Sequence, residues 1–307
     1  MRKLSKLGLS LAIIATLSLS GCGGSSSSDD NTTAENTTVV KSGKFIDSQV
    51  SGIEYSTSTQ HGITDENGSF SYIEGETVTF KIGGITLGNT QANDVITPLD
   101  TLGVTSAQSK NAVDMFIMLQ SLDADNNNSN GIQISANTLE SSNSMSVDFT
   151  QENLIDMSSI LIQFGISSSN IKSEIDAKKH FTSSILSQYS NANDTLTTDY
   201  LNSKTFYTKS FVDSSGDYYY RYSKITYTNN HYTVKEYNDY SNGRVWEEYG
   251  EDYTISNNAI IGGHTNATLV KIQDKKLILL ESYGYPESWG AQIEEYWTTK
   301  PSGFPAE

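Results

Sequence analysis

One polar segment of this chain places oxygen-bearing side chains at alternate positions, as a cation-binding loop does. The first, third and fifth positions and one later position are Asp123, Asp125, Asn127 and Asn130. Alternate side chains of a curled loop can converge on one hard cation, and calcium prefers carboxylate and amide oxygens. The segment departs from the EF-hand pattern, since it lacks the central glycine and has Ile134 where a bidentate glutamate is expected. We therefore expect either a calcium loop of another kind or a polar turn that ends a helix.

Aromatic side chains gather in the last third of the chain and form a second candidate site. Of the 18 tyrosines, 15 lie at or beyond Tyr200, as do all three tryptophans. Exposed rings can stack on the faces of sugars or line a pocket for an apolar ligand. The alternative is that the rings pack across strands, because tyrosine is a good strand former. The candidate ligand-binding residues are Tyr220, Tyr222, Trp246, Trp289 and Trp297.

The sequence offers little that points to catalysis. The pairs Glu247-Glu248 and Glu294-Glu295 suggest the carboxylates of a glycosidase. Neighbouring strand residues point to opposite faces, however, so each pair offers only one carboxylate to a site. We expect both pairs on a solvated face. The four histidines lack the spacing of a zinc site, and the sequence has no nucleophile elbow or phosphate loop. A non-enzymatic protein is therefore favoured over a hydrolase.

The first 21 residues have the organisation of a bacterial export signal. Three basic residues precede an apolar run that is too short to span a bilayer. The single cysteine, Cys22, follows this run directly. Leu19-Ser20-Gly21-Cys22 resembles the lipobox of bacterial lipoproteins, which implies cleavage before Cys22 and attachment of acyl chains such as palmitate to its sulfur. The alternative is an ordinary signal peptide followed by a chance cysteine.

An acylated Cys22 would anchor the protein firmly in a membrane of the cell envelope. Gly23 rather than aspartate follows the cysteine, which is similar to the sorting rule of enteric bacteria and implies the outer membrane. The net charge of −16 disfavours binding to nucleic acid. The expected partners are the lipid bilayer, through the acyl anchor, and a glycan, an apolar ligand or an envelope protein.

Composition and periodicity divide the chain into five parts, and the fold class that they predict is mainly β with a small helical subdomain. Short alternating strands predict an N-terminal β-sandwich, helical periodicity predicts central helices, and strands separated by tight turns predict a C-terminal antiparallel meander or barrel. The parts are the signal peptide at 1–21, the lipidated cysteine and flexible tether at 22–42, the β-sandwich at 43–100, the helical subdomain at 101–195 and the tyrosine-rich meander at 200–307.

Two segments resemble known β-domains. The run from Gly62 to Tyr72 is similar to the hairpin of carboxypeptidase-regulatory-like domains, which implies a transthyretin-like sandwich. Lys204-Thr205-Phe206-Tyr207 and Lys276-Leu277-Ile278-Leu279 look like parts of the lipocalin-like domains of bacterial lipoproteins. A lipocalin-like meander would close into a barrel of about eight strands, which leaves no free edge.

The central region predicts three helices. The first starts near Ser106 to Ser109 and buries one apolar face. The second has Thr150 as its N-cap and Gly165 as its stop, and the third runs over about 170–189.

These patterns predict a membrane-anchored envelope lipoprotein that acts as a non-enzymatic binding module for a glycan or a small apolar ligand. The alternative is an adhesion or envelope-structural protein without a small-molecule ligand. A hollow meander would favour a binder, and a filled meander would favour a structural protein. Titratable groups that converge in a cleft would favour an enzyme.

Overall fold

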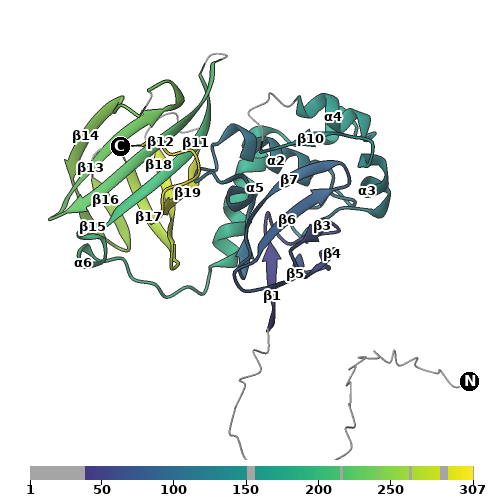
Figure 1. Cartoon of the computed structure of the whole chain (residues 1–307), viewed down its shortest axis with the longest axis horizontal. Helices are drawn as coiled ribbons and strands as arrows, with labels where there is room; N and C mark the ends of the chain where they lie inside the picture. The colour runs from purple at the N-terminus through teal and green to yellow at the C-terminus, as the bar shows by residue number, and fades with distance from the viewer. Residues whose placement is uncertain are drawn as a thin grey trace, which may run out of the picture. The chain divides into compact units, whose positions relative to one another are not determined.

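The largest sheet lies in the C-terminal region and has nine antiparallel strands among the residues that the structure describes (Figure 1). The computed structural model describes residues 39–150, 156–214, 217–241, 243–262, 265–283 and 290–306. The strands are β11 (Thr205–Ser214), β12 (Asp217–Thr228), β13 (His231–Asn238), β14 (Glu247–Asp252), β15 (Thr254–Ser256), β16 (Ala259–Gly262), β17 (Thr265–Ile272), β18 (Lys276–Tyr283) and β19 (Ala291–Trp297). Their order in the sheet is β14-β13-β12-β11-β19-β18-β17-β16-β15.

The large sheet curls so that its first and last strands in the sequence, β11 and β19, lie next to each other. Tyr207 pairs with Trp297 at this junction. The two edges belong to β14 and β15, which are consecutive in the chain. A Cβ on Gly262 would lie 2.5 Å from the Asp252 carbonyl oxygen, so β16 passes close to the end of β14. The sheet is therefore a nearly closed, barrel-like meander, with one strand more than the eight expected.

Asparagine pairs form two of the hairpin turns that the sequence predicts. Asn229 and Asn230 have φ angles of 50° and 63°, and Asn257 and Asn258 have 49° and 63°. Two consecutive residues in the left-handed region match the twist of the flanking strands, and asparagine tolerates this region better than most residues. These turns fix the register of β12 against β13 and of β15 against β16.

Two smaller sheets form the N-terminal region. The phenyl rings of Phe45 and Phe80 join them, with centroids 4.7 Å apart, and Phe70 packs edge-on against Phe80 at 5.2 Å. One sheet has the order β5-β1-β8 and the other β10-β7-β6-β3-β4. Their strands are β1 (Val40–Phe45), β3 (Glu54–Ser56), β4 (His61–Ile63), β5 (Ser69–Ile73), β6 (Thr77–Ile82), β7 (Ile85–Gln91), β8 (Val95–Ile96) and β10 (Val147–Asp148), and a separate pair is β2 (Val50–Ser51) with β9 (Ile132–Gln133).

The α-helices follow β8 in the chain, alternate with the short strands β9 and β10, and end before the large sheet begins at β11. They are α1 (Pro98–Leu102), α2 (Lys110–Ser121), α3 (Ala136–Ser142), α4 (Met157–Gln163), α5 (Glu174–Gln188) and α6 (Thr198–Leu201), with 3₁₀ turns η1 (Ser168–Asn170) and η2 (Asp239–Ser241). The prediction of a mainly β chain with a small helical part is confirmed.

Helices α2, α4 and α5 correspond to the three predicted helices, with one correction. The α4 helix begins at Asp156, whose side chain accepts a hydrogen bond from the Ser159 backbone, and not at Thr150. Thr150 instead follows β10 in a turn, and residues 151–155 lie outside the described ranges. Gly165 ends α4 with a φ of 79°, as predicted.

The segment 105–109, between α1 and α2, joins the helices to the large sheet. The Thr105 N–H donates to the Lys209 carbonyl at 2.8 Å, and the Phe211 N–H donates to the Ser109 hydroxyl at 2.7 Å. Helix α2 contacts β11, and α5 contacts β19 (Figure 1). The residues from Thr38 to Glu307 consequently form one compact unit. Within the described residues, no helix is both long enough and apolar enough to cross a membrane.

Candidate functional site

The large sheet encloses a cavity of about 750 Å³. Alternate side chains of each strand point inward, as the pleat requires. On β12 the lining residues are Arg221, Ser223, Ile225 and Tyr227. One end of the sheet is filled by an apolar cluster that includes Phe206, and α2 and α5 contribute residues to the cavity at the other end. The interior of the meander is therefore partly hollow.

A cluster of charged and aromatic side chains, contributed by three neighbouring strands and the turn before one of them, forms one wall of the cavity. Burial raises the pKa of Glu236 on β13, and the nearby Arg221 guanidinium partly opposes this rise. The Tyr249 hydroxyl donates a hydrogen bond to Glu236 Oε1 at 3.3 Å. The Arg221 guanidinium carbon lies 5.9 Å from the ring centroid of Trp246, which is 52% exposed. This wall offers both donors and acceptors to a polar ligand.

Two buried glutamates occupy the opposite wall. Glu281 is 4% exposed and accepts a hydrogen bond from the Tyr296 hydroxyl at 2.6 Å. Glu294 is 5% exposed and accepts one from the Ser106 hydroxyl at 2.5 Å. Burial raises the pKa of Tyr227 well above its usual value, and the charge of Glu281 raises it further. The cavity thus holds carboxylates and hydroxyls in an environment with little water.

Helices α2 and α5 bring two lysines to the cavity. Lys110 forms an ion pair with Asp114 on the same helix, and Lys178 forms one with Glu174 at 3.0 Å. Burial raises the pKa of Asp114, and Lys110 opposes this rise. Each lysine therefore already has a carboxylate of its own helix beside it.

Tyr220 and Tyr222 lie on the outer face of β12 and do not line the cavity. The C-terminal segment covers Tyr222, with the Phe304 ring 5.6 Å from that of Tyr222, and Tyr220 packs against Phe211 with ring centroids 5.0 Å apart. The Lys209 Nζ lies 4.1 Å from the centroid of the Tyr220 ring and donates a hydrogen bond to the Ser302 carbonyl of the C-terminal segment. Strand alternation directs Arg221 inward instead, because it lies between the two tyrosines. The aromatic side of this strand is therefore the packed side.

The tryptophans do not come together at one place. Trp246 lies beside the Arg221 wall and is exposed. Trp297 lies on the outer face of β19, where its indole N–H donates to Glu295 Oε2 at 2.8 Å. Trp289 lies outside the described residues. A ligand contact by any of the five predicted aromatic residues stays a prediction.

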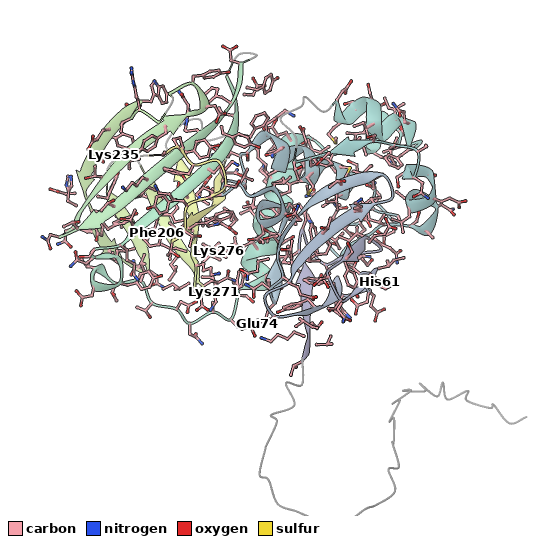
Figure 2. The ribbon with its side chains drawn as sticks, in the orientation of Figure 1. His61, Glu74, Phe206, Lys235, Lys271 and Lys276 are labelled. Atoms are coloured by element: carbon pink, nitrogen blue, oxygen red, sulfur yellow. The ribbon has the colours of Figure 1, made fainter. Side chains whose placement is uncertain are left out.

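The expected solvated face for Glu294-Glu295 is wrong, because both sides of β19 are covered. The two side chains do point to opposite faces, but Glu295 is only 1% exposed. It lies against Lys276 (labelled in Figure 2), and Lys276 Nζ is 2.8 Å from Glu295 Oε1 and 2.7 Å from Asp100 Oδ1. Burial lowers the pKa of Lys276, but the two carboxylates together raise it more. The result lies above the usual value for lysine.

The four predicted calcium ligands lie in one loop after α2. Asp123 Oδ1 accepts from the Gln133 N–H at 2.9 Å, and Asp125 Oδ2 accepts from the Asn130 amide at 2.8 Å. Asn127 Oδ1 accepts from the Ser129 hydroxyl. Among the described residues, no group of three or more histidine, cysteine, aspartate or glutamate side chains could hold a metal. Calcium binding here stays a prediction.

Comparison with known proteins relates one segment of the chain to longer proteins. No family model matches the chain. No solved structure matches it. Over 68 residues the chain is 38% identical to a protein of Escherichia coli strain K12 named "Putative lipoprotein AcfD homolog". It is 37% identical over 68 residues to "Putative lipoprotein YghJ" of Escherichia coli O78:H11 strain H10407. Each match covers 21% of this chain and 4% of the relative, so the similarity is confined to one part of each protein.

Proposed function

We propose that this protein is an envelope lipoprotein, anchored through Cys22, whose C-terminal sheet binds a small ligand without catalysis. The lipobox-like residues before Cys22 support the anchor, and so do the names of the two Escherichia coli relatives. The observation that carries the binding role is the hollow interior of the sheet, about 750 Å³ in volume. An adhesion or envelope-structural protein without a ligand has no need of such a cavity.

A glycan fits this cavity better than an apolar ligand does. Arg221, Glu236 and Glu294 all line its walls. Glu236 and Glu294 already accept hydrogen bonds from Tyr249 and Ser106, but hydrocarbon placed against these charged groups would displace the water around them and add no hydrogen bond, which is costly in a site of low polarity. The hydroxyl groups of a sugar can pair with these side chains, and its apolar faces can stack on tyrosine rings. The ligand class that we propose is therefore a glycan.

A hydrolase is the second candidate, and one observation favours it. Among the carboxylates that line the cavity, those of Glu236, Glu281 and Glu294 lie on its strand walls, as paired acids do in the clefts of glycosidases. Release of reducing ends from bound glycans would distinguish this candidate, because a binding module leaves its ligand intact.

The anchor is tested by replacing the cysteine. In a Gram-negative host we expect the unmodified protein to sediment with outer-membrane fractions and to begin at an acylated Cys22. Cys22→Ser removes the sulfur that accepts the lipid, so we expect no acyl mass and no membrane association. An unmodified protein with an intact leader, or a mature N-terminus without acyl mass, would contradict the proposal.

The cavity is tested by filling it. Ser223 is 8% exposed and lines the cavity, so Ser223→Trp should occupy the space of the ligand. We expect it to weaken glycan binding by at least ~100-fold, which corresponds to roughly 3 kcal/mol. Glycan-array binding followed by titration calorimetry, on the full chain purified in detergent, measures this loss.

The matched control places the same side chain on the outer face of the sheet. Lys235 lies on β13 and its side chain is 40% exposed (Figure 2). Lys235→Trp should bind the glycan as the unmodified chain does. Equal binding by Ser223→Trp and the unmodified chain would place the ligand outside the cavity.

A further inference from the structure

We propose that Ser48 and His180 are the nucleophile and the general base of a second site, which hydrolyses small uncharged carboxylic esters. Ser48 lies in the turn between β1 and β2, and His180 lies on α5. Ser48 Oγ is 3.3 Å from His180 Nε2. A hydroxyl within hydrogen-bond reach of an imidazole is the arrangement that activates a serine for attack on a carbonyl carbon. This activity is separate from glycan binding in the large sheet.

The backbone of Ser48 is strained. Ile46 and Gln49 pair across the turn, so Asp47 and Ser48 are its two central residues. Ser48 has a φ of 53°, in a region that glycine and asparagine adopt far more readily than serine. Strain of this kind persists only where the surrounding structure holds it, and it gathers at functional sites. A serine at this position therefore indicates a use for its hydroxyl.

A buried glutamine positions the turn against the helix that carries His180. Gln120 on α2 is 1% exposed, and its Nε2 atom donates to both carboxyl oxygens of Asp47 and to the Ala177 carbonyl, each at 3.1 Å. Ala177 precedes His180 by three residues on α5, so the two lie on the same side of the helix. The distance between Ser48 and His180 is thus set by contacts in the protein interior.

The surroundings of His180 keep its ring in the form that a base needs. Burial lowers the pKa of His180, and a hydrogen bond from the ring to the Asp47 backbone carbonyl partly opposes this effect. The imidazole is therefore neutral at pH 7 and can accept a proton. The same carbonyl orients the ring and stabilises the imidazolium that forms when the proton arrives.

Ser48 and His180 line a pocket of about 360 Å³, which is large enough for a small molecule. Among its described lining residues none is an aspartate, glutamate, lysine or arginine. A charged substrate would find no counter-ion there, so a neutral ester fits best. Gln49 and Gln188 also line the pocket, and side-chain amides are donors of the kind that a developing oxyanion requires.

The reaction proceeds in two steps. His180 Nε2 takes the proton of Ser48 Oγ as this oxygen attacks the ester carbonyl, and it gives the proton to the leaving alcohol, so that an acyl ester of Ser48 remains. His180 then takes a proton from water, whose oxygen adds to the acyl carbon. The proton returns to Ser48 Oγ as the carboxylic acid leaves.

Two neighbouring groups compete with this proton transfer. The Ser48 hydroxyl donates to the Asn128 carbonyl at 3.2 Å, so it must rotate toward His180 before it attacks. The Ser184 hydroxyl lies 3.4 Å from His180 Nε2, but it donates to the His180 carbonyl at 3.0 Å, one turn back on the helix. Ser48 is therefore the better nucleophile of the two serines.

The test labels the full chain in detergent with a fluorophosphonate, which reacts with activated serines, and locates the adduct by peptide mass analysis. We expect one adduct, on Ser48. Hydrolysis of p-nitrophenyl acetate gives a second readout. Ser48→Gly should abolish both signals, and its denaturant midpoint should be equal or higher, because glycine relieves the strain of the positive φ. Loss of both signals then reports the missing hydroxyl and not unfolding.

A second variant tests the base, and a matched variant serves as control. His180→Gln should lower kcat/KM for p-nitrophenyl acetate by at least ~100-fold, because a positioned base contributes about 10²–10⁴-fold. Ser203→Gly should keep labelling and hydrolysis, since Ser203 also has a positive φ, of 62°, but lies between α6 and β11.

Three results would overturn the assignment. They are no labelling or hydrolysis by the unmodified chain, an adduct on Ser184 instead of Ser48, and full activity of Ser48→Gly. Each would leave glycan binding by the large sheet untouched. If His180→Gln does not fold, the labelled residue and Ser48→Gly decide.

Discussion

Replacing Lys276 by alanine is expected to lower the free energy of unfolding by about 3–5 kcal/mol, because it leaves the buried Glu295 carboxylate and the partly buried Asp100 carboxylate without their cation. Lys276 Nζ lies 2.7 Å from Asp100 Oδ1 and 2.8 Å from Glu295 Oε1. The Lys276 side chain is 12% exposed and that of Glu295 only 2%, so water cannot replace the lost partner. Breaking a buried ion pair on one side costs more than the pair contributes when intact.

The loss of stability on replacing Lys276 should extend beyond its own strand, because Lys276 contacts residues of two different regions. Asp100 belongs to the capping box of α1, where its side chain also accepts from the Thr97 backbone N–H at 2.9 Å. Glu295 and Lys276 belong to adjacent strands of the large sheet. The ion group therefore joins the N-terminal region to the large sheet, and its loss should reduce the cooperativity between them.

Denaturant titration followed by far-UV and tyrosine signals measures this effect. Lys235→Ala is the control, because Lys235 pairs with Glu248 at 3.4 Å and both side chains are well exposed (Figure 2). An exposed pair of this kind contributes about 0–1 kcal/mol. If the two variants lose similar stability, the buried ion group does not hold the two regions together.

Local patterns were sufficient to predict the elements of the fold. The α2 helix follows from apolar residues at helical spacing, such as Ala112, Phe116 and Leu119, which the structure buries completely. The hairpins follow from asparagine pairs that accept positive φ. Such signals depend only on neighbours in the sequence, so one chain is enough to read them.

The face that each strand presents to the cavity could not be predicted in the same way. Along β12 the aromatic positions, Tyr220 and Tyr222, suggest a ligand surface, whereas both are buried and Phe304 of the C-terminal segment packs on Tyr222. Arg221 and Ser223 look like solvent positions but line the cavity. Period-two alternation separates two faces without saying which is covered, and the answer depends on a segment about 80 residues away.

The same limit explains the buried carboxylates. Glu294 and Glu295 look solvated in the sequence, but their partners are Ser106 and Lys276. Ser106 belongs to the segment 105–109, which crosses to β11 and β19 through backbone hydrogen bonds. The Ser106–Glu294 contact joins residues 188 positions apart, and the Lys276–Glu295 contact exists only because β18 pairs with β19, so neither contact leaves a local signal in the sequence. They decide where the cavity has its charges, so the site was less predictable than the fold.

Stability of the unmodified protein should fall between about pH 4 and pH 8 through one buried aspartate. Asp47 is fully buried, and burial raises its pKa to about 8, although Gln120 Nε2 donates to both of its oxygens at 3.1 Å. In the unfolded chain an aspartate releases its proton near pH ~4. The folded protein therefore binds more protons than the unfolded chain throughout this range, and its stability falls as pH rises. The contribution of Asp47 is complete below the unfolded pKa and lost as pH passes the folded one.

Asp47→Asn isolates this effect, because the amide keeps the shape of the side chain and does not titrate. We expect the stability of the variant relative to the unmodified protein to rise between pH 5 and pH 8, by roughly 1.4 kcal/mol per pH unit. Denaturant midpoints at several pH values measure the difference. The pKa of Glu295 is also raised by burial, to about 7, but this residue is present in both proteins and cancels from the comparison.

Asp156→Asn provides a control of opposite sign. Hydrogen bonds from Ser159 lower the pKa of Asp156, so its contribution is present above the unfolded pKa and lost as pH falls. Asparagine is an equally good N-cap, which leaves α4 intact. The stability of the Asp156→Asn variant relative to the unmodified protein should therefore fall as pH rises through the acidic range in which Asp156 loses its proton. A pH-independent difference for Asp47→Asn would mean that Asp47 is already ionised in the folded protein, with a cation or water beside it that satisfies the charge.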